Sequence, residues 1–186
     1  MQTWVVATEV LEVAPGARRF RNPLSSDPIE PFPGYATEPV GEPVAAPQAF
    51  LPRLDEADGI DPSDPIAKLT GRPEPAREAV PEFAPYGSHS LVRVLGALRT
   101  SRYGLGEVCG ALLHDNRKVT GWTRDAFAYD DRSANLYQAH PWVLCVRADG
   151  SAFGVIVETT WRFHAHLHDH LVFEVEGPPP AVTVIE

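Results

Sequence analysis

Short apolar runs alternate with polar positions and glycine turns through the second half of the chain. The runs cover residues 91–95, 108–113, 118–122, 142–146, 152–159, 162–167, 171–175 and 182–185. Runs of this length that are rich in β-branched and aromatic residues and bounded by turn residues are typical of β-strands. Asp149-Gly150 predicts a hairpin between two of them, and no long amphipathic helix interrupts the series. The pattern therefore predicts an all-β fold, an antiparallel β-sandwich.

The first half of the chain has a different texture because fifteen of its prolines precede Gly87, out of 19 in the whole sequence. Residues 4–13 predict one strand, closed by Pro15-Gly16. In 22–52 a proline recurs every few residues, which favours an extended linker because proline removes a backbone donor and restricts the preceding residue.

The acidic residues at 54–64 recur mainly at threes, whereas an EF-hand calcium loop has carboxylates at alternate positions, so we interpret this run as a solvated loop. The next residues, Ser63-Asp64-Pro65, favour a short helix over 63–70. We thus predict a Pro-rich, largely irregular segment at 1–87 with one strand and this helix, and a β-sandwich domain at 88–186.

Composition narrows the classes of partner. The formal net charge of -9 leaves no extended basic patch, so we expect no nucleic acid partner. There is no apolar stretch of about 20 residues and no basic leader at the N-terminus, so we expect no membrane span and a cytoplasmic location. Cys109 and Cys145 lie in different predicted elements without CxxC spacing, which predicts two buried thiols rather than a disulfide.

A polar and aromatic loop at 122–135 is the first candidate for chemistry. It holds Arg124, Asp125, Tyr129, Asp130, Asp131 and Arg132. Aromatic faces beside carboxylates and guanidinium groups are suited to sugar recognition, since rings pack on the C–H face of a pyranose and the charged groups bind its hydroxyls. The same residues would also suit an exposed turn with mutually paired charges.

Three motifs occur in order around this loop. They are Tyr103-Gly104-Leu105-Gly106-Glu107, Trp122-Thr123-Arg124-Asp125, and Asn135-Leu136-Tyr137-Gln138-Ala139-His140-Pro141-Trp142. In this order and spacing they resemble the N-terminal, galactose-mutarotase-like β-sandwich domain of glycoside hydrolase family 31, the α-glucosidase family. The resemblance covers about the second half of the chain, and Thr123 stands where the family often has asparagine.

The resemblance implies a function and partners. In the family this loop reaches over a catalytic (β/α)8 barrel, and the aspartate at the position of Asp125 helps to form the substrate-binding pocket. Trp122, Arg124 and Phe127 become candidate walls of that pocket, with an α-glucoside or α-glucan as ligand. Because the family's catalytic carboxylates belong to the barrel, of the same or a separate chain, we expect no catalytic residue and no cofactor here.

Other readings stay open. An aldose 1-epimerase-like enzyme on the same fold would need a histidine facing a glutamate in one concave pocket, for which His140 and Glu158 are the candidates. A third reading is a docking module whose exposed strand edge binds a separate barrel. Otherwise His140 is expected to be structural, like the tight glycine turn at 103–107.

Alternating histidines mark the residues near the C-terminus, namely His164, His166, His168 and His170. On one continuous strand they would share a face and could hold zinc or nickel. The apolar rhythm breaks at 168–170, however, and a turn there would place the two pairs on different strands. We therefore expect no metal site.

Overall fold

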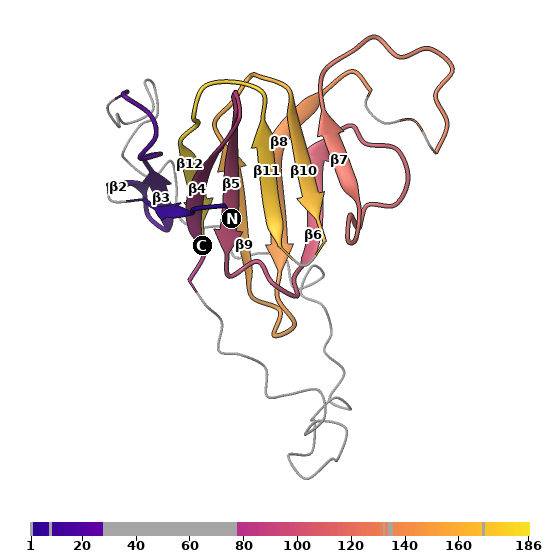
Figure 1. Ribbon diagram of the computed structural model, residues 1–186. Coiled ribbons are helices and arrows are strands. Elements are labelled where there is room, and N and C mark those ends of the chain that lie inside the picture. Colours follow the sequence, from indigo (N-terminus) through magenta and orange to yellow (C-terminus); the bar gives the residue numbers. More distant parts are fainter. Residues whose placement is uncertain (1, 8, 28–77, 132, 134–135, 169) are drawn as a thin grey trace.

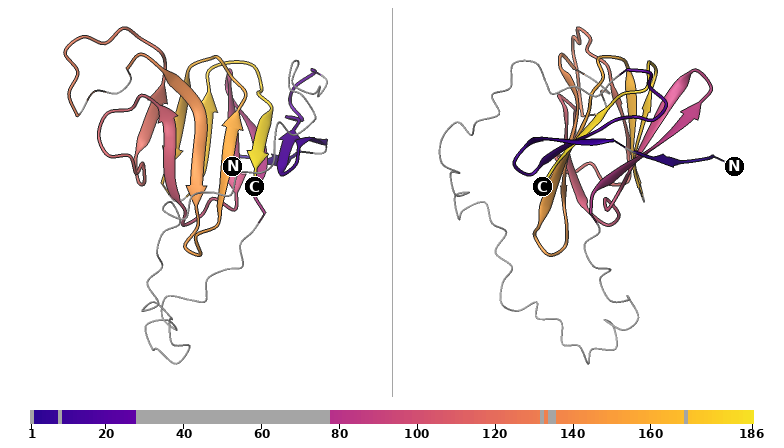
Figure 2. Two further views of the ribbon diagram at one scale, coloured as in Figure 1. Left: turned by 180° about the vertical axis from the view of Figure 1, so that it is seen from behind. Right: turned by 90° about the vertical axis from the view of Figure 1, so that its left-hand side faces the viewer.

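The computed structural model describes residues 2–7, 9–27, 78–131, 133, 136–168 and 170–186. Its strands form two antiparallel sheets that face each other, as the edge-on view in Figure 2 shows. Among the described residues there are no helices, so none could cross a membrane. The prediction of an all-β antiparallel sandwich is confirmed.

The first sheet has the strand order β1-β4-β5-β11-β10-β7 (Figure 1). Its strands are β1 (Val5–Val6), β4 (Val80–Tyr86), β5 (His89–Leu95), β11 (Leu171–Val175), β10 (Phe163–Leu167) and β7 (Lys118–Gly121). The predicted pair at 162–167 and 171–175 is confirmed as the β10–β11 hairpin, in which Phe163 lies opposite Val175 and Leu167 opposite Leu171.

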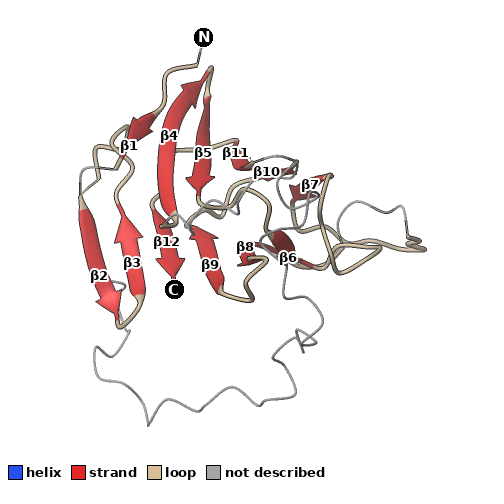
Figure 3. Cartoon of the chain, turned by 90° about the horizontal axis from the view of Figure 1, so that it is seen from below, coloured by secondary structure: helices blue, strands red, loops and turns tan. Residues whose placement is uncertain are grey.

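The second sheet has the order β2-β3-β12-β9-β8-β6 (Figure 3). Its strands are β2 (Val10–Ala14), β3 (Ala17–Phe20), β12 (Val182–Ile185), β9 (Ala152–Val157), β8 (Ala139–Val146) and β6 (Ser101–Gly106). The predicted hairpin around Asp149-Gly150 is confirmed as β8–β9, with Val146 opposite Ala152.

The core lies between the sheets and follows the alternation of side chains along each strand. On β10, Phe163, Ala165 and Leu167 are buried while the histidines between them lie on the other face. Phe163 packs against Phe173 of β11 with ring centroids 5.8 Å apart. The inner residues of β9 and β12 close the core from the second sheet; they are Phe153, Val155, Val157, Val182 and Val184.

The N-terminal residues differ from the expectation of a single strand at 4–13. The described part of this stretch forms two strands, and they belong to different sheets: β1 pairs with β4, and β2 pairs with β3. The alternating pattern is interrupted between Val6 and Val10, which lets the chain pass from one sheet to the other. The sandwich therefore begins before residue 88.

Strand β4 was also missed because it contains Pro81 and Pro85. A proline is tolerated in a strand where its missing N–H faces no partner. Only Glu82 and Phe83 pair with the short strand β1, so both prolines lie outside that contact. The expected linker at 22–52 lies outside the described residues after Asp27, as do the acidic loop at 54–64 and the helix at 63–70.

The strand predicted at 108–113 is wrong. These residues form bends and turns between β6 and β7, with Gly110 at φ 98°. The apolar run does not alternate between two faces, and Leu112 is 84% exposed. The two cysteines are free thiols, as predicted, but only Cys145 is buried, and burial raises the pKa of its thiol to about 11.

His114 is buried beside β6, and it predicts an acid-sensitive fold. Burial lowers the pKa of His114, although its Nε2 contacts the Gly104 carbonyl oxygen at 3.0 Å. The unfolded chain then binds more protons than the folded one just below the ordinary histidine pKa of about 6.5, so stability falls as the pH drops through that value.

We expect the midpoint of urea unfolding to fall when the pH is lowered from 7.5 to 5.5, and to fall less for His114→Gln. An exposed control, His140→Gln, should keep the full decrease; equal decreases in all three proteins would refute the assignment.

Candidate functional site

Glu107 fixes the base of the loop that carries Asp125. One of its carboxylate oxygens, Oε2, accepts hydrogen bonds from the backbone N–H groups of Tyr137 at 2.9 Å and Gln138 at 3.1 Å. The backbone N–H of Glu107 in turn donates to the carbonyl oxygen of Gln138 at 2.8 Å. The first and third motifs are thus joined directly, although 30 residues separate Glu107 from Tyr137.

The glycines before Glu107 lie in strand β6, not in the tight turn expected from the sequence. β6 pairs with β8, and the register shifts between Gly104 and Gly106, which is a β-bulge. Gly104 and Gly106 have φ angles of 114° and 88°, a region that residues with a Cβ rarely adopt. At Gly104 a Cβ would also collide with the Trp142 backbone. The glycines therefore let the end of β6 lie close to the start of β8, where the loop at 122–138 ends.

A loop at 122–138 joins β7 to β8, and its described residues, 122–131, 133 and 136–138, extend away from the two sheets (Figure 1). Its described residues are held by internal contacts. The Tyr137 hydroxyl donates to the carbonyl oxygen of Ala126 at 2.6 Å, and Ala126 is buried. The backbone N–H of Arg124 donates to the carbonyl oxygen of Leu136 at 3.2 Å. The segment that contains Asp125 is thus tied to the end of the loop, just before β8.

The predicted binding residues have different positions within this loop. Trp122, Arg124, Asp125 and Phe127 are all exposed. Trp122 lies under the guanidinium group of Arg162, whose Cζ is 5.0 Å from the ring centroid. Trp122 also lines a cavity, whereas Arg124, Asp125 and Phe127 do not. The structure therefore brings only Trp122 of the predicted set into a pocket.

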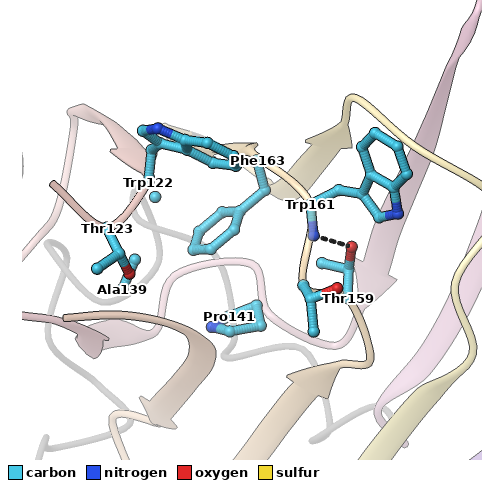
Figure 4. Close-up of a pocket in the computed structure, with 9 residues that line it drawn as sticks. Trp122, Thr123, Ala139, Pro141, Thr159, Trp161 and Phe163 are labelled. Atoms are coloured by element: carbon cyan, nitrogen blue, oxygen red, sulfur yellow. Dashed lines mark hydrogen bonds between the residues drawn. The ribbon is translucent and has the colours of Figure 1, made fainter.

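This cavity, which we call the Trp122 pocket, has a volume of about 190 Å³. Figure 4 shows Trp122 and Trp161 on opposite sides, with Phe163 and Pro141 between them. Gly121 has no Cβ, and the ring of Phe163 occupies the space that one would need. The side chains of Thr123 and Thr159 add hydroxyl groups to the wall. Aromatic faces with nearby hydroxyls can bind the apolar and polar sides of a small ring.

Sequence reasoning did not find Trp161, Phe163 and Pro141 as pocket residues, because they lie outside the loop at 122–138. A signal was present in Thr159-Thr160-Trp161, a polar and aromatic segment at the end of a predicted strand. Trp161 is 55% exposed, and its backbone N–H donates to the Thr159 hydroxyl at 3.1 Å.

The pair considered for epimerase chemistry has other partners. Glu158 accepts hydrogen bonds from the Arg19 guanidinium group, the shortest at 2.7 Å, and from the Thr183 hydroxyl at 2.8 Å. His140 is exposed, and its Nε2 lies 3.2 Å from Oε1 of Gln138. Since the Glu158 carboxylate already serves an ion pair, this arrangement does not favour an acid–base role for it.

The four alternating histidines do not share one strand, but, contrary to our expectation, the second pair is not on a strand of its own. His164 and His166 lie on β10, while His168 and His170 lie outside the strands. The Nε2 atom of His164 lies 3.1 Å from Oε1 of Glu176, and Nε2 of His166 lies 3.7 Å from Oε2 of Glu174. Within the described residues, no three His, Cys, Asp or Glu side chains are grouped so that they could hold a metal ion.

Three exposed apolar side chains lie on the two loops that flank β7, residues 107–117 and 122–138. They are Leu112 and Phe127, each 84% exposed, and Tyr129, at 57%.

The contacts of Glu107 give a testable prediction. Glu107→Gln keeps the size of the side chain but removes the charge that strengthens its two hydrogen bonds. We expect the amides of Tyr137 and Gln138 to exchange hydrogen about 3-fold to 10-fold faster, the equivalent of about 1 kcal/mol. Amide exchange measured by NMR checks this prediction. The control variant is Glu12→Gln, at an exposed position of β2. Unchanged exchange at both amides would show that Glu107 does not hold the loop.

Comparisons with known proteins agree with this geometry. Residues 82–165 match the family described as the glycosyl hydrolase 31 N-terminal galactose mutarotase-like domain. None of the curated proteins matches the chain.

Similar solved structures are large enzymes. A family 31 dextranase of Flavobacterium johnsoniae in complex with glucose is 18% identical, with a TM-score of 0.47, over 55% of this chain and 13% of that chain. A family 31 α-glucosidase from Bacteroides thetaiotaomicron is 40% identical, with a TM-score of 0.43, over 47% of this chain and 15% of that one. A cycloalternan-degrading enzyme from Trueperella pyogenes is 18% identical, with a TM-score of 0.47, over 56% of this chain and 16% of that chain.

This chain thus covers less than a fifth of the length of each of these enzymes, 13%, 15% and 16%. The family match confirms the resemblance stated from the three motifs. The matched residues include all three motifs and the two strands, β7 and β8, that flank the loop at 122–138. Residues 82–165, which make up part of the two-sheet sandwich, match the N-terminal galactose mutarotase-like domain of glycosyl hydrolase family 31.

Proposed function

We propose that this chain is a non-catalytic domain of an α-glucosidase-type enzyme and that it binds and positions an α-glucoside or α-glucan. The loop at 122–138 presents Asp125 to the saccharide, and the Trp122 pocket receives part of it. The observation that carries the proposal is an exposed carboxylate on a loop that Glu107 and Tyr137 fasten at its base.

The chemistry of the loop supports this assignment. Asp125 can accept hydrogen bonds from two neighbouring sugar hydroxyls, and Arg124 can donate to a third. The faces of Trp122 and Trp161 offer apolar area to the C–H side of a pyranose. Because the described loop is fastened by backbone hydrogen bonds, the carboxylate is held in place before the ligand arrives, which reduces the entropy lost on binding.

A docking role follows from the same loops. Leu112, Phe127 and Tyr129 are exposed apolar side chains on the two loops that flank β7, and a partner that covers this surface would remove them from water. We propose that the partner is a catalytic (β/α)8 barrel of the same or a separate chain. Docking through this surface would place Asp125 at the edge of the barrel's substrate pocket.

A hydrolysis assay tests the non-catalytic part. Retaining α-glucosidases need two carboxyl groups about 5 Å apart across the scissile bond. The acidic residues Asp130 and Asp131 are adjacent in the loop, and neither lines the Trp122 pocket. We expect the purified chain to release no p-nitrophenol from p-nitrophenyl α-glucoside. Turnover near 1 s⁻¹ or faster, in the range of ordinary enzymes, would reject the proposal.

A further inference from the structure

A second cavity, larger than the Trp122 pocket, lies between the N-terminal hairpin and the segment at 158–161. Its volume is about 550 Å³. It shares Thr159, Thr160 and Trp161 with the Trp122 pocket and extends from there to residues 19–27 and 178–181. We call it the Asn22 cavity. Nothing in the loop at 122–138 contributes to its wall.

Asn22 supplies a buried donor at the wall of this cavity. The residue is only 1% exposed. Its Oδ1 accepts the backbone N–H of Leu24 at 3.0 Å, which fixes the orientation of the amide and directs Nδ2 elsewhere. Among the residues that the structure describes, the Nδ2 group has no hydrogen-bond partner. A buried amide donor without a partner costs about 1–3 kcal/mol, which a ligand oxygen at this position would recover.

Arg21 adds a second donor from the neighbouring position. Two groups of its guanidinium are engaged: Nη1 donates to Glu9 Oε2 at 2.9 Å, and Nη2 donates to the Ser25 carbonyl oxygen at 3.4 Å. The third, Nε, is buried and has no hydrogen-bond partner within the described ranges of the chain. Consecutive residues of one segment thus line the cavity, each with one N–H group that is not used within the protein.

Trp161 provides an apolar wall. Its indole packs directly on Gly177, where a Cβ would collide with the ring. Its backbone is tied to Thr159, so the side chain projects from a fixed point. More than half of the residue, 55%, is exposed. A large, exposed aromatic ring beside hydrogen-bond donors is the combination that recognises a pyranose.

The charges around the cavity are balanced within the protein. Arg19 pairs with Glu158 at 2.7 Å, and Arg21 pairs with Glu9 at 2.9 Å. Asp27 adds a negative charge at the wall. Because both cations are already neutralised and a further carboxylate is present, the cavity disfavours phosphate and other anions. A neutral ligand with several hydroxyl groups fits these donors better.

From these features we infer that the Asn22 cavity is a second saccharide-binding site that takes a neutral pyranose. Asn22 Nδ2 and Arg21 Nε donate to ring hydroxyls, and Trp161 packs on the C–H face. The inference does not depend on Asp125 or on a catalytic barrel. It would let the domain hold a glycan at a place separate from the loop at 122–138.

Titration of the full chain with isomaltose, maltose or cellobiose tests the inference. The sequence has only 4 tryptophans, so the indole N–H signals of Trp161 and Trp122 can be followed separately in ¹⁵N NMR spectra. We expect at least one disaccharide to shift the Trp161 signal in a saturable way, with a Kd of about 1 mM. Inorganic phosphate at the same concentrations should leave it unchanged.

Two variants identify the residues responsible. Asn22→Asp keeps the acceptor for Leu24 but removes the Nδ2 donor, and Trp161→Ala removes the ring. Each should weaken binding at this site by about 10-fold or more. Tyr86→Ala, a change of an aromatic residue with the same 55% exposure on another hairpin, should leave Kd unchanged. Thermal unfolding verifies that each variant is folded.

Several results would overturn the inference. They are an unchanged Trp161 signal with all three disaccharides at up to about 50 mM, far above the expected Kd; binding that Asn22→Asp does not weaken; and binding of phosphate in place of sugar. Failure here is distinct from failure of the proposed function, which depends on the Trp122 signal and on Asp125→Ala. Because Trp161 lines both cavities, Asn22→Asp distinguishes them: a Trp161 response that this variant does not weaken belongs to the Trp122 pocket and leaves the loop proposal intact.

Discussion

Phe173→Ala is expected to lower the free energy of unfolding by about 3–5 kcal/mol, the usual cost of removing a buried aromatic ring. Phe173 is fully buried in β11, a strand paired on both sides, and packs against Phe163 at 5.8 Å. The truncation removes apolar contacts and leaves a cavity between the two sheets. Since domains have only about 5–15 kcal/mol of stability, much of the total would be lost.

Urea unfolding followed by tryptophan fluorescence measures this effect, and Phe127→Ala is its matched control. Phe127 is 84% exposed, so its replacement should change stability by less than about 0.5 kcal/mol. Similar losses for the two phenylalanines would contradict the assignment of the core. A fully unfolded Phe173→Ala protein agrees with it, and Phe173→Leu then gives a smaller and measurable loss.

Arg19→Leu is expected to cost about 3 kcal/mol, because it leaves the Glu158 carboxylate partly buried without its cation. The side chains of Arg19 and Glu158 are 16% and 14% exposed, and both guanidinium Nε and Nη2 donate to the carboxylate. The ion pair connects β3 to the end of β9 across β12, where Thr183 donates to the same carboxylate.

A double variant separates this ion pair from packing. Replacing Arg19 and Glu158 together with leucine removes both charges, and we expect it to recover most of the loss, since well-packed apolar residues often substitute for a buried pair. Chemical denaturation of the two single variants and the double variant gives the coupling. If the double variant is as unstable as the sum of the singles, Arg19 and Glu158 do not stabilise the fold as a pair.

Local sequence patterns predicted the strands whose side chains alternate cleanly. β10 and β11 have apolar residues at every second position, and the strand β10 ends before His168. The sequence did not predict β4, because its prolines argue against a strand. The prolines are tolerated because only two other residues of β4 pair with β1. The split of residues 4–13 between two sheets depends on partners far along the chain, which no local pattern contains.

The candidate site was predicted only in part, because some of its contacts join segments that are far apart in the sequence. The loop and Trp122 followed from neighbouring residues and from the family motifs. The role of Glu107 could not be predicted from composition, since its partners are Tyr137 and Gln138 across the β6–β8 bulge. Trp161 and Asn22 come from segments outside every motif, and only the folded chain places them around one cavity.

The central claim is that the loop at 122–138 presents Asp125 to a saccharide. A titration of the ¹⁵N-labelled chain with isomaltose, followed by NMR, tests it most directly. We predict saturable shifts of the Trp122 indole and of the backbone amides from Thr123 to Asp125, and their loss in a folded Asp125→Ala variant. An unchanged loop at saturating isomaltose, or shifts that persist in Asp125→Ala, would contradict the account.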